Sequence, residues 1–87
     1  MSKKIWKYHI PDHGTLKLLL PYGARPVKVG MQYSKVVIWV EFDTSVQENI
    51  EREFAAFATG DVIPYNTIHI DTIFDSGYVW HVYEVIA

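Results

Sequence analysis

The sequence predicts a small, mostly β domain: an antiparallel sandwich or barrel of six to seven strands, with either a short helix or a further strand around residues 44–58. Two observations lead to this prediction. Hydrophobic and polar residues alternate along most of the chain, which is the pattern of strands with one buried face. Short breaks rich in Pro, Gly, Asp and Ser separate the alternating runs, as turns between antiparallel strands do. The 87 residues therefore form one domain, 1–87.

Six segments show the alternation, and we expect each to be a strand: residues 6–10, 16–20, 27–33, 36–42, 67–74 and 78–86. The segment 36–42 is apolar on both faces and rich in β-branched residues, which predicts a central strand. Ser34 and Lys35 are expected at the tip of a hairpin, and Gly77 in the last turn is free to adopt a positive φ. Since these connections are short, we expect consecutive strands to pair with each other.

Residues 44–59 carry two competing patterns. One set of apolar residues has the spacing of a helical stripe: Val46, Ile50, Phe54 and Phe57. The other pattern is a loop followed by a strand over 52–59, whose inward residues would be Phe54, Ala56 and Ala58. Good helix formers in this segment favour the helix locally.

The composition of the chain argues against several classes of function. The formal charge is −2, from 8 basic and 10 acidic residues, which gives no basic stripe for duplex nucleic acid. There is no cysteine and no apolar run long enough for a membrane span, so we expect a cytoplasmic protein that does not bind membranes. The sequence contains no group of neighbouring residues that could serve together as nucleophile, base and acid. We therefore expect no enzymatic activity, no cofactor and no metal site.

Several short segments together resemble a family of small, uncharacterised tailed-phage proteins, known as a domain of unknown function. They are residues 4–10, 20–24, 37–40, 53–60, 63–64 and 80–84. The resemblance implies phage origin, an accessory role such as counter-defence, and a strand over 52–59. Members typically read Gly-Thr-Gly-His-Pro-Ile-Pro where this chain has residues 58–64, with Asp61 and Val62 in place of the histidine and the first proline. Any role of that histidine does not carry over.

Three groups of residues are candidates for binding a ligand. Tyr78 and Trp80 could stack on a base, with His81 beside them, although a central strand that fills the core would look the same. Gly60 lets the backbone approach a ligand and Asp61 could accept hydrogen bonds from a sugar, although an ordinary turn also uses glycine. The third group is expected to meet phosphate: Arg25, Lys28 and Arg52, with Lys35 equally exposed.

These observations predict a small phage accessory protein without catalytic activity that sequesters a nucleotide-type immune signal. The alternatives are a protein–protein inhibitor or adaptor that acts on a host or defence protein, and a minor virion component. Exposed aromatic residues would serve as anchors in the inhibitor. The small size of the chain also predicts a homodimer or a higher homo-oligomer. A concave aromatic and polar pocket favours the nucleotide binder, and a flat apolar patch favours the inhibitor.

Overall fold

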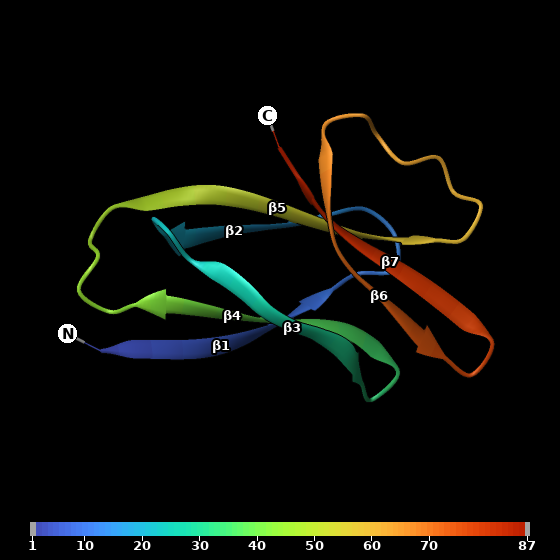
Figure 1. Ribbon diagram of the computed structural model, residues 1–87, viewed down its shortest axis with the longest axis horizontal. Helices are drawn as coiled ribbons and strands as arrows, with labels where there is room; N and C mark the ends of the chain where they lie inside the picture. Colours follow the sequence, from blue (N-terminus) through green and yellow to red (C-terminus); the bar gives the residue numbers. More distant parts are fainter. Residues whose placement is uncertain (1, 87) are drawn as a thin grey trace.

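The computed structural model describes residues 2–86, which form seven β-strands and no helix (Figure 1). The strands are β1 (Lys3–Ile10), β2 (Leu16–Pro21), β3 (Arg25–Gln32), β4 (Lys35–Asp43), β5 (Asn49–Ala58), β6 (Thr67–Asp75) and β7 (Tyr78–Val85). No helix in this part of the chain is long and apolar enough to cross a membrane.

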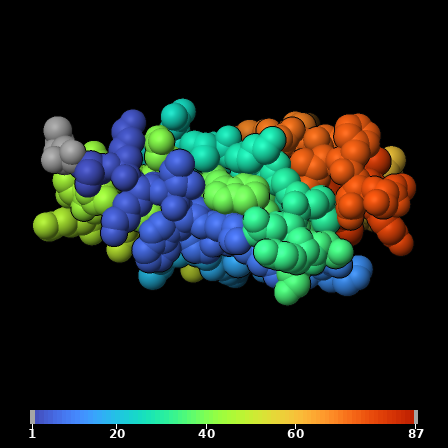
Figure 2. All heavy atoms as spheres, turned by 90° about the horizontal axis from the view of Figure 1, so that it is seen from below, coloured from blue at the N-terminus to red at the C-terminus, as the bar shows by residue number. Residues whose placement is uncertain are grey.

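The strands form two separate antiparallel sheets. One has the order β1-β4-β3 and the other the order β2-β5-β7-β6. Figure 2 looks onto the three-stranded sheet, with β1 in blue, β3 in teal and side chains of β4 in green between them. Each sheet keeps two edge strands, so the molecule is an open sandwich and not a closed barrel. The predicted class, strand number and central position of residues 36–42 are confirmed.

The core lies between the sheets and is made by the alternating residues that the sequence pattern predicts. Its fully buried members are Ile10, Leu20, Val29, Val36, Ile38, Val40, Phe54 and Val82. Phe54 is the largest of them, and Trp80 packs against the cluster while remaining partly exposed. Each strand therefore turns one face inward, as a two-layer β-fold requires.

The pairing of strands differs from the prediction. Only β3–β4 and β6–β7 are hairpins of consecutive strands, whereas β1 pairs with β4, β2 with β5, and β5 with β7. The chain passes from one sheet to the other after β1, β2 and β4. The expectation of consecutive pairing is thus wrong for most connections, because the alternation fixes which residues face inward but not which strands are neighbours.

The segment around residues 44–58 contains a strand, so the helix alternative is wrong. β5 pairs with β2 on one side and with β7 on the other, and it buries Phe54 and Ala56. The helical spacing of Val46, Ile50, Phe54 and Phe57 is incidental, because two flanking strands satisfy the backbone of β5 and outweigh local helix propensity.

Two local irregularities adjust the three-stranded sheet. The β3–β4 turn is formed by Tyr33 and Ser34, both at positive φ (53° and 62°), so the hairpin tip lies one residue before the predicted position. A bulge between Pro26 and Lys28 leaves Val27 exposed. The bulge restores the alternation so that Val29 faces the core and Lys28 faces outward.

Candidate functional site

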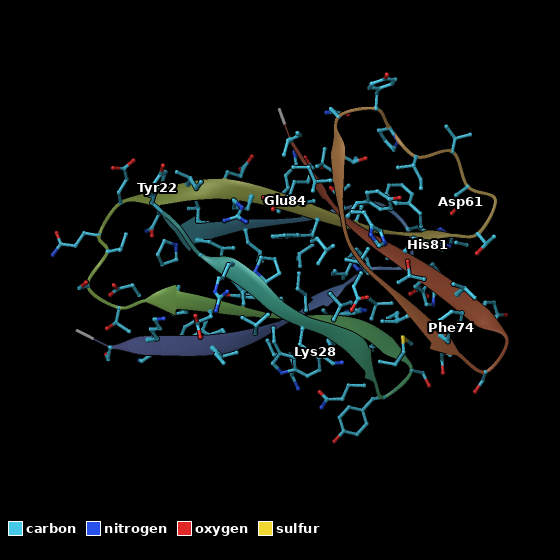
Figure 3. The ribbon with its side chains drawn as sticks, viewed as in Figure 1. Tyr22, Lys28, Asp61, Phe74, His81 and Glu84 are labelled. Carbon is cyan, nitrogen blue, oxygen red and sulfur yellow. The ribbon has the colours of Figure 1, made fainter. Side chains whose placement is uncertain are left out.

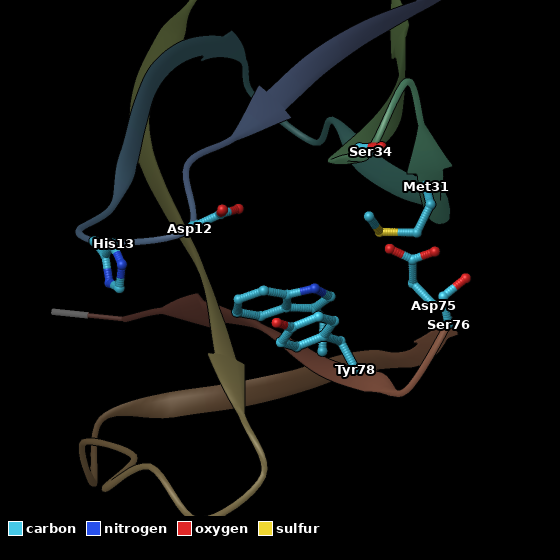
Figure 4. A pocket seen from close by; sticks show the side chains of 8 residues that line it. Asp12, His13, Met31, Ser34, Asp75, Ser76 and Tyr78 are labelled. Atoms are coloured by element: carbon cyan, nitrogen blue, oxygen red, sulfur yellow. The ribbon is translucent and has the colours of Figure 1, made fainter.

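A cavity of about 590 Å³ opens at one end of the sandwich, where three connections meet (Figure 4). The β1–β2 loop contributes Asp12 and His13, and the β3–β4 turn contributes Ser34. The end of β6 contributes Asp75, and the β6–β7 turn contributes Ser76. This volume falls within the range of about 300–1,000 Å³ that small-molecule sites occupy.

Aromatic side chains form the inner wall of this end cavity. Tyr78 and Trp80 come from β7 and point inward on the same side of the strand, and Met31 from β3 faces them. Trp80 also contacts the core cluster, which holds its ring in place. Tyr78 is 66% exposed and therefore free to contact a ligand. The cavity offers two aromatic rings to a planar group.

Two carboxylates border the same cavity. Asp12 and Asp75 approach from different sides of the Tyr78 ring in Figure 4. Within residues 2–86 neither carboxylate pairs with a basic side chain. Unpaired carboxylates at a cavity wall accept hydrogen bonds from hydroxyl or amino groups and repel anions.

A second hollow of about 460 Å³ adjoins the end cavity and shares three of its residues, Asp12, His13 and Ser34. Lys35 and His9 also line it. Lys35 is exposed and has no acidic partner among the described residues. The second hollow thus supplies the cation that the end cavity lacks.

The structure brings together only part of the predicted site. Tyr78 and Trp80 line the end cavity, but His81 points to the opposite face of β7. There its ring joins a chain of hydrogen bonds: His81 Nε2 lies 2.9 Å from Thr59 Oγ1, and His81 Nδ1 lies 3.0 Å from Thr72 Oγ1. Thr72 Oγ1 in turn lies 2.8 Å from His69 Nε2. His81 therefore has partners on both ring nitrogens and does not face the cavity.

Gly60 and Asp61 form an ordinary turn after β5. Gly60 has a φ of 98°, the Asp61 amide donates to the Ala58 carbonyl at 3.1 Å, and the Asp61 carboxylate accepts from the Ala58 amide at 2.9 Å. Neither residue lines a hollow at the end of the sandwich. The hydrogen bond to the Ala58 amide thus gives Asp61 a structural role, and no ligand is needed to account for an aspartate at this position.

The three predicted phosphate contacts are dispersed. Arg25 and Lys28 lie on the outer face of the three-stranded sheet, and Figure 3 shows Lys28 and Asp61 on separate parts of the molecule. Arg52 lies between the sheets, where its guanidinium binds both carboxylate oxygens of Glu84 and donates to the Ala24 carbonyl at 2.8 Å. Arg52 is therefore committed to a structural ion pair.

Within residues 2–86 no group of three or more His, Cys, Asp or Glu side chains is placed to hold a metal ion. His69 and Tyr83 pack edge to face, with ring centroids 5.1 Å apart. His69 lies opposite Tyr83, whereas after a bulge Asp71 lies opposite Val82, so Asp71 does not share the sheet face of His69 and His81.

Sequence reasoning missed Asp12, His13, Ser34 and Asp75 as site residues. Their only common signal is that each lies in or next to a break between alternating runs. The strand order brings these three breaks together at one end of the sandwich, and the alternation does not predict that order.

A family profile for a domain of unknown function (DUF7352) matches residues 1–87. The chain belongs to this family. The uncharacterised family expected from the sequence is thus confirmed at this level, and the DUF7352 domain spans the whole chain. No curated protein and no solved structure matches the chain. The end cavity must therefore be interpreted from its own residues.

Proposed function

We propose that this DUF7352 domain binds a nucleotide-type small molecule in the end cavity and holds it without turnover. The observation that carries the proposal is the combination of Tyr78 and Trp80 with the unpaired carboxylates of Asp12 and Asp75 in one cavity. Aromatic rings stack on a base, and each such contact is worth roughly 1–3 kcal/mol. The carboxylates would accept hydrogen bonds from the ribose hydroxyls.

A phosphate group would lie in the adjoining hollow. Asp12 and Asp75 repel an anion inside the end cavity, whereas Lys35 borders the second hollow beyond Ser34. This placement replaces the predicted phosphate contacts Arg25, Lys28 and Arg52, none of which lines either hollow. The ligand would extend around the β3–β4 turn, with its base inside and its phosphate outside.

The biological setting extends the proposal. The sequence resemblance supports a phage accessory protein that acts in the host cytoplasm, and a stoichiometric binder of a nucleotide signal would counter a defence system without catalysis.

The hydroxyl groups of the end cavity support binding over turnover. They belong to Ser34, Ser76 and Tyr78, and within residues 2–86 none of them is hydrogen-bonded to a basic side chain that could activate it as a nucleophile.

Isothermal titration calorimetry with adenosine, AMP, cyclic nucleotides and ADP-ribose tests this function. We expect AMP to bind more tightly than adenosine, and Lys35→Gln to remove that difference. Tyr78→Ala should weaken binding of both ligands by about tenfold, because an exposed stacking ring is lost. Arg25→Gln on the sheet face is the matched control and should change nothing. Absence of heat with every ligand, or full affinity in Tyr78→Ala, would refute the proposal.

One observation favours a second function, contact with a protein partner. An apolar hollow of about 360 Å³ lies between β1 and β2, and it contains Trp6, Leu19 and Phe42. Trp6 is 53% exposed and Leu19 is 73% exposed, and Trp6 packs edge to face on Phe42. Tryptophan is a frequent anchor in interfaces. We propose a second copy of the chain as the occupant, because a domain of this size gains buried surface by pairing.

Sedimentation equilibrium tests the pairing. The wild-type protein is expected to form a dimer at micromolar concentration, and Trp6→Ser is expected to be monomeric with an unchanged circular dichroism spectrum. Tyr33→Ser, which removes an exposed ring at another site, should remain dimeric. A wild-type protein that stays monomeric at all concentrations would contradict the pairing and leave the ligand proposal intact.

A further inference from the structure

The outer face of the three-stranded sheet gathers most of the basic residues. The strand register places five of them on it: Lys3 and Lys7 from β1, Lys35 from β4, and Arg25 and Lys28 from β3. We call this surface the basic sheet face. Figure 2 views it directly, with β1 and β3 on either side of β4.

The basic sheet face has a charge opposite to that of the whole molecule. Its five basic side chains stand beside two acidic ones, Glu41 and Asp43, so its formal charge is +3. The remaining 3 basic and 8 acidic residues carry −5, which gives the net −2 of the chain. A mildly acidic protein thus presents one compact positive surface, which attracts polyanions.

Both acidic residues on this face already have partners. Glu41 lies 3.3 Å from Arg25 and 3.7 Å from Lys3. Asp43 accepts hydrogen bonds from the Ser45 hydroxyl at 2.7 Å and the Ser45 amide at 2.8 Å, and these bonds lower the pKa of its carboxyl. The other three basic residues, Lys7, Lys28 and Lys35, have no acidic partner among the described residues.

Trp39 lies at the centre of this face. Its direct neighbours across the sheet are Lys7 on β1 and Lys28 on β3. Its ring extends over Gly30, where a Cβ atom would lie 3.5 Å from the Cζ3 atom of the indole. The absence of a side chain at Gly30 thus lets the ring lie against the sheet, partly exposed and flanked by two lysines.

We infer that the basic sheet face binds single-stranded nucleic acid, with one base stacked on Trp39 and the flanking phosphates bound by Lys7 and Lys28. Stacking on an aromatic ring requires an unpaired base, so a duplex would lose this contact. A sheet surface with an aromatic residue between basic ones is the usual construction of single-strand binding sites. Trp39, Lys7 and Lys28 line neither the end cavity nor the second hollow, so this inference does not depend on the proposed ligand, although Lys35 at the end of the same face lines the second hollow.

Fluorescence anisotropy with labelled 15-nucleotide oligo(dT), oligo(U) and a duplex of equal length tests the inference at low salt. We expect both single strands to bind and the duplex to bind more weakly. Trp39→Ala should weaken single-strand binding by roughly 5- to 150-fold, and Trp39→Phe should retain most of it. Lys7→Gln with Lys28→Gln should lower the slope of log affinity against log salt by about 1.4, or 0.7 per lost phosphate contact.

Two controls separate recognition from general charge attraction. Lys17→Gln removes a lysine from β2 of the other sheet, where the strand register places it opposite Glu53, and should leave the salt slope unchanged. Circular dichroism confirms that each variant is folded. Absence of binding to both single strands overturns the inference. Equal affinity for duplex and single strand, with no loss in Trp39→Ala, also overturns it, because the face would then attract any polyanion.

Discussion

Arg52 illustrates how a single charged residue can be structural in a small β-sandwich. Its side chain points between the sheets and is only 15% exposed, and that of Glu84 is 18% exposed. The guanidinium forms two bonds to the carboxylate and one to the Ala24 carbonyl. This geometry joins β5 to β7 and to the segment before β3, and it satisfies a charge that would be costly to leave unpaired there.

Arg52→Ala is therefore expected to lower the free energy of unfolding by about 2–3 kcal/mol, because it leaves the Glu84 carboxylate half-buried without a partner. Urea denaturation followed by circular dichroism measures the change. Arg52→Met combined with Glu84→Leu should recover much of the loss, since apolar side chains need no partner. If Arg52→Ala were as stable as the wild type, the ion pair would have no structural role.

At the scale of single residues, the sequence predicted the core well and the site only in part. Tyr78 and Trp80 were correctly assigned to one face of a strand, because alternation has a period of two. Arg52 was expected to meet phosphate, because nothing in the sequence shows that the Glu84 carboxylate on the neighbouring strand binds its guanidinium. Pairing across strands depends on register, which the local pattern leaves undetermined.

The strands and turns explain how the end cavity is formed. The β3–β4 turn places Tyr33 and Ser34 at positive φ although neither is glycine or asparagine. The β6–β7 turn uses Ser76 and Gly77 in the same region of φ. Both tight turns lie beside the cavity, and Ser34 and Ser76 line it. Their conformations thus position the residues that surround the opening.

Replacing Tyr33 and Ser34 with Asn and Gly should raise the free energy of unfolding by about 1 kcal/mol, because these residues adopt positive φ at lower cost. The matched change in the other hairpin, Gly77→Ala, should lower it by about 1 kcal/mol. No atom lies within 4 Å of the added Cβ there, so this loss would come from the backbone alone. Thermal denaturation measures both. A stabilised Gly77→Ala variant would contradict this account of the turns.

The segment β5 shows where sequence reasoning reaches its limit for whole elements. Its apolar residues fit a helix as well as a strand, and its local propensity favours the helix. Two strands that are distant in sequence, β2 and β7, decide the outcome by pairing with both of its edges. An element in the middle of a sheet is determined by its neighbours, so no local pattern could have settled it.

At the scale of the whole molecule, two surfaces differ in the residues that they present. One end carries an aromatic and carboxylate-lined cavity, and the outer face of the three-stranded sheet carries a positive charge around Trp39. The net charge of −2 does not reveal the positive face, because its five basic residues come from three different strands. The strand order gathers them, and it also brings three separate turns to one end of the sandwich.

A ¹H–¹⁵N correlation NMR titration of the protein with AMP tests directly whether the end cavity binds a nucleotide. The ligand proposal predicts saturable shifts confined to the end cavity and the adjoining hollow, at His13, Ser34, Lys35, Ser76 and Tyr78. The signals of Lys3 to Lys7 in β1 and of Lys28 on the outer face of β3 should not move, because none of these residues lines either hollow. No shifts at millimolar AMP, or shifts centred on Lys28 and Trp39 instead, would contradict nucleotide binding in the end cavity.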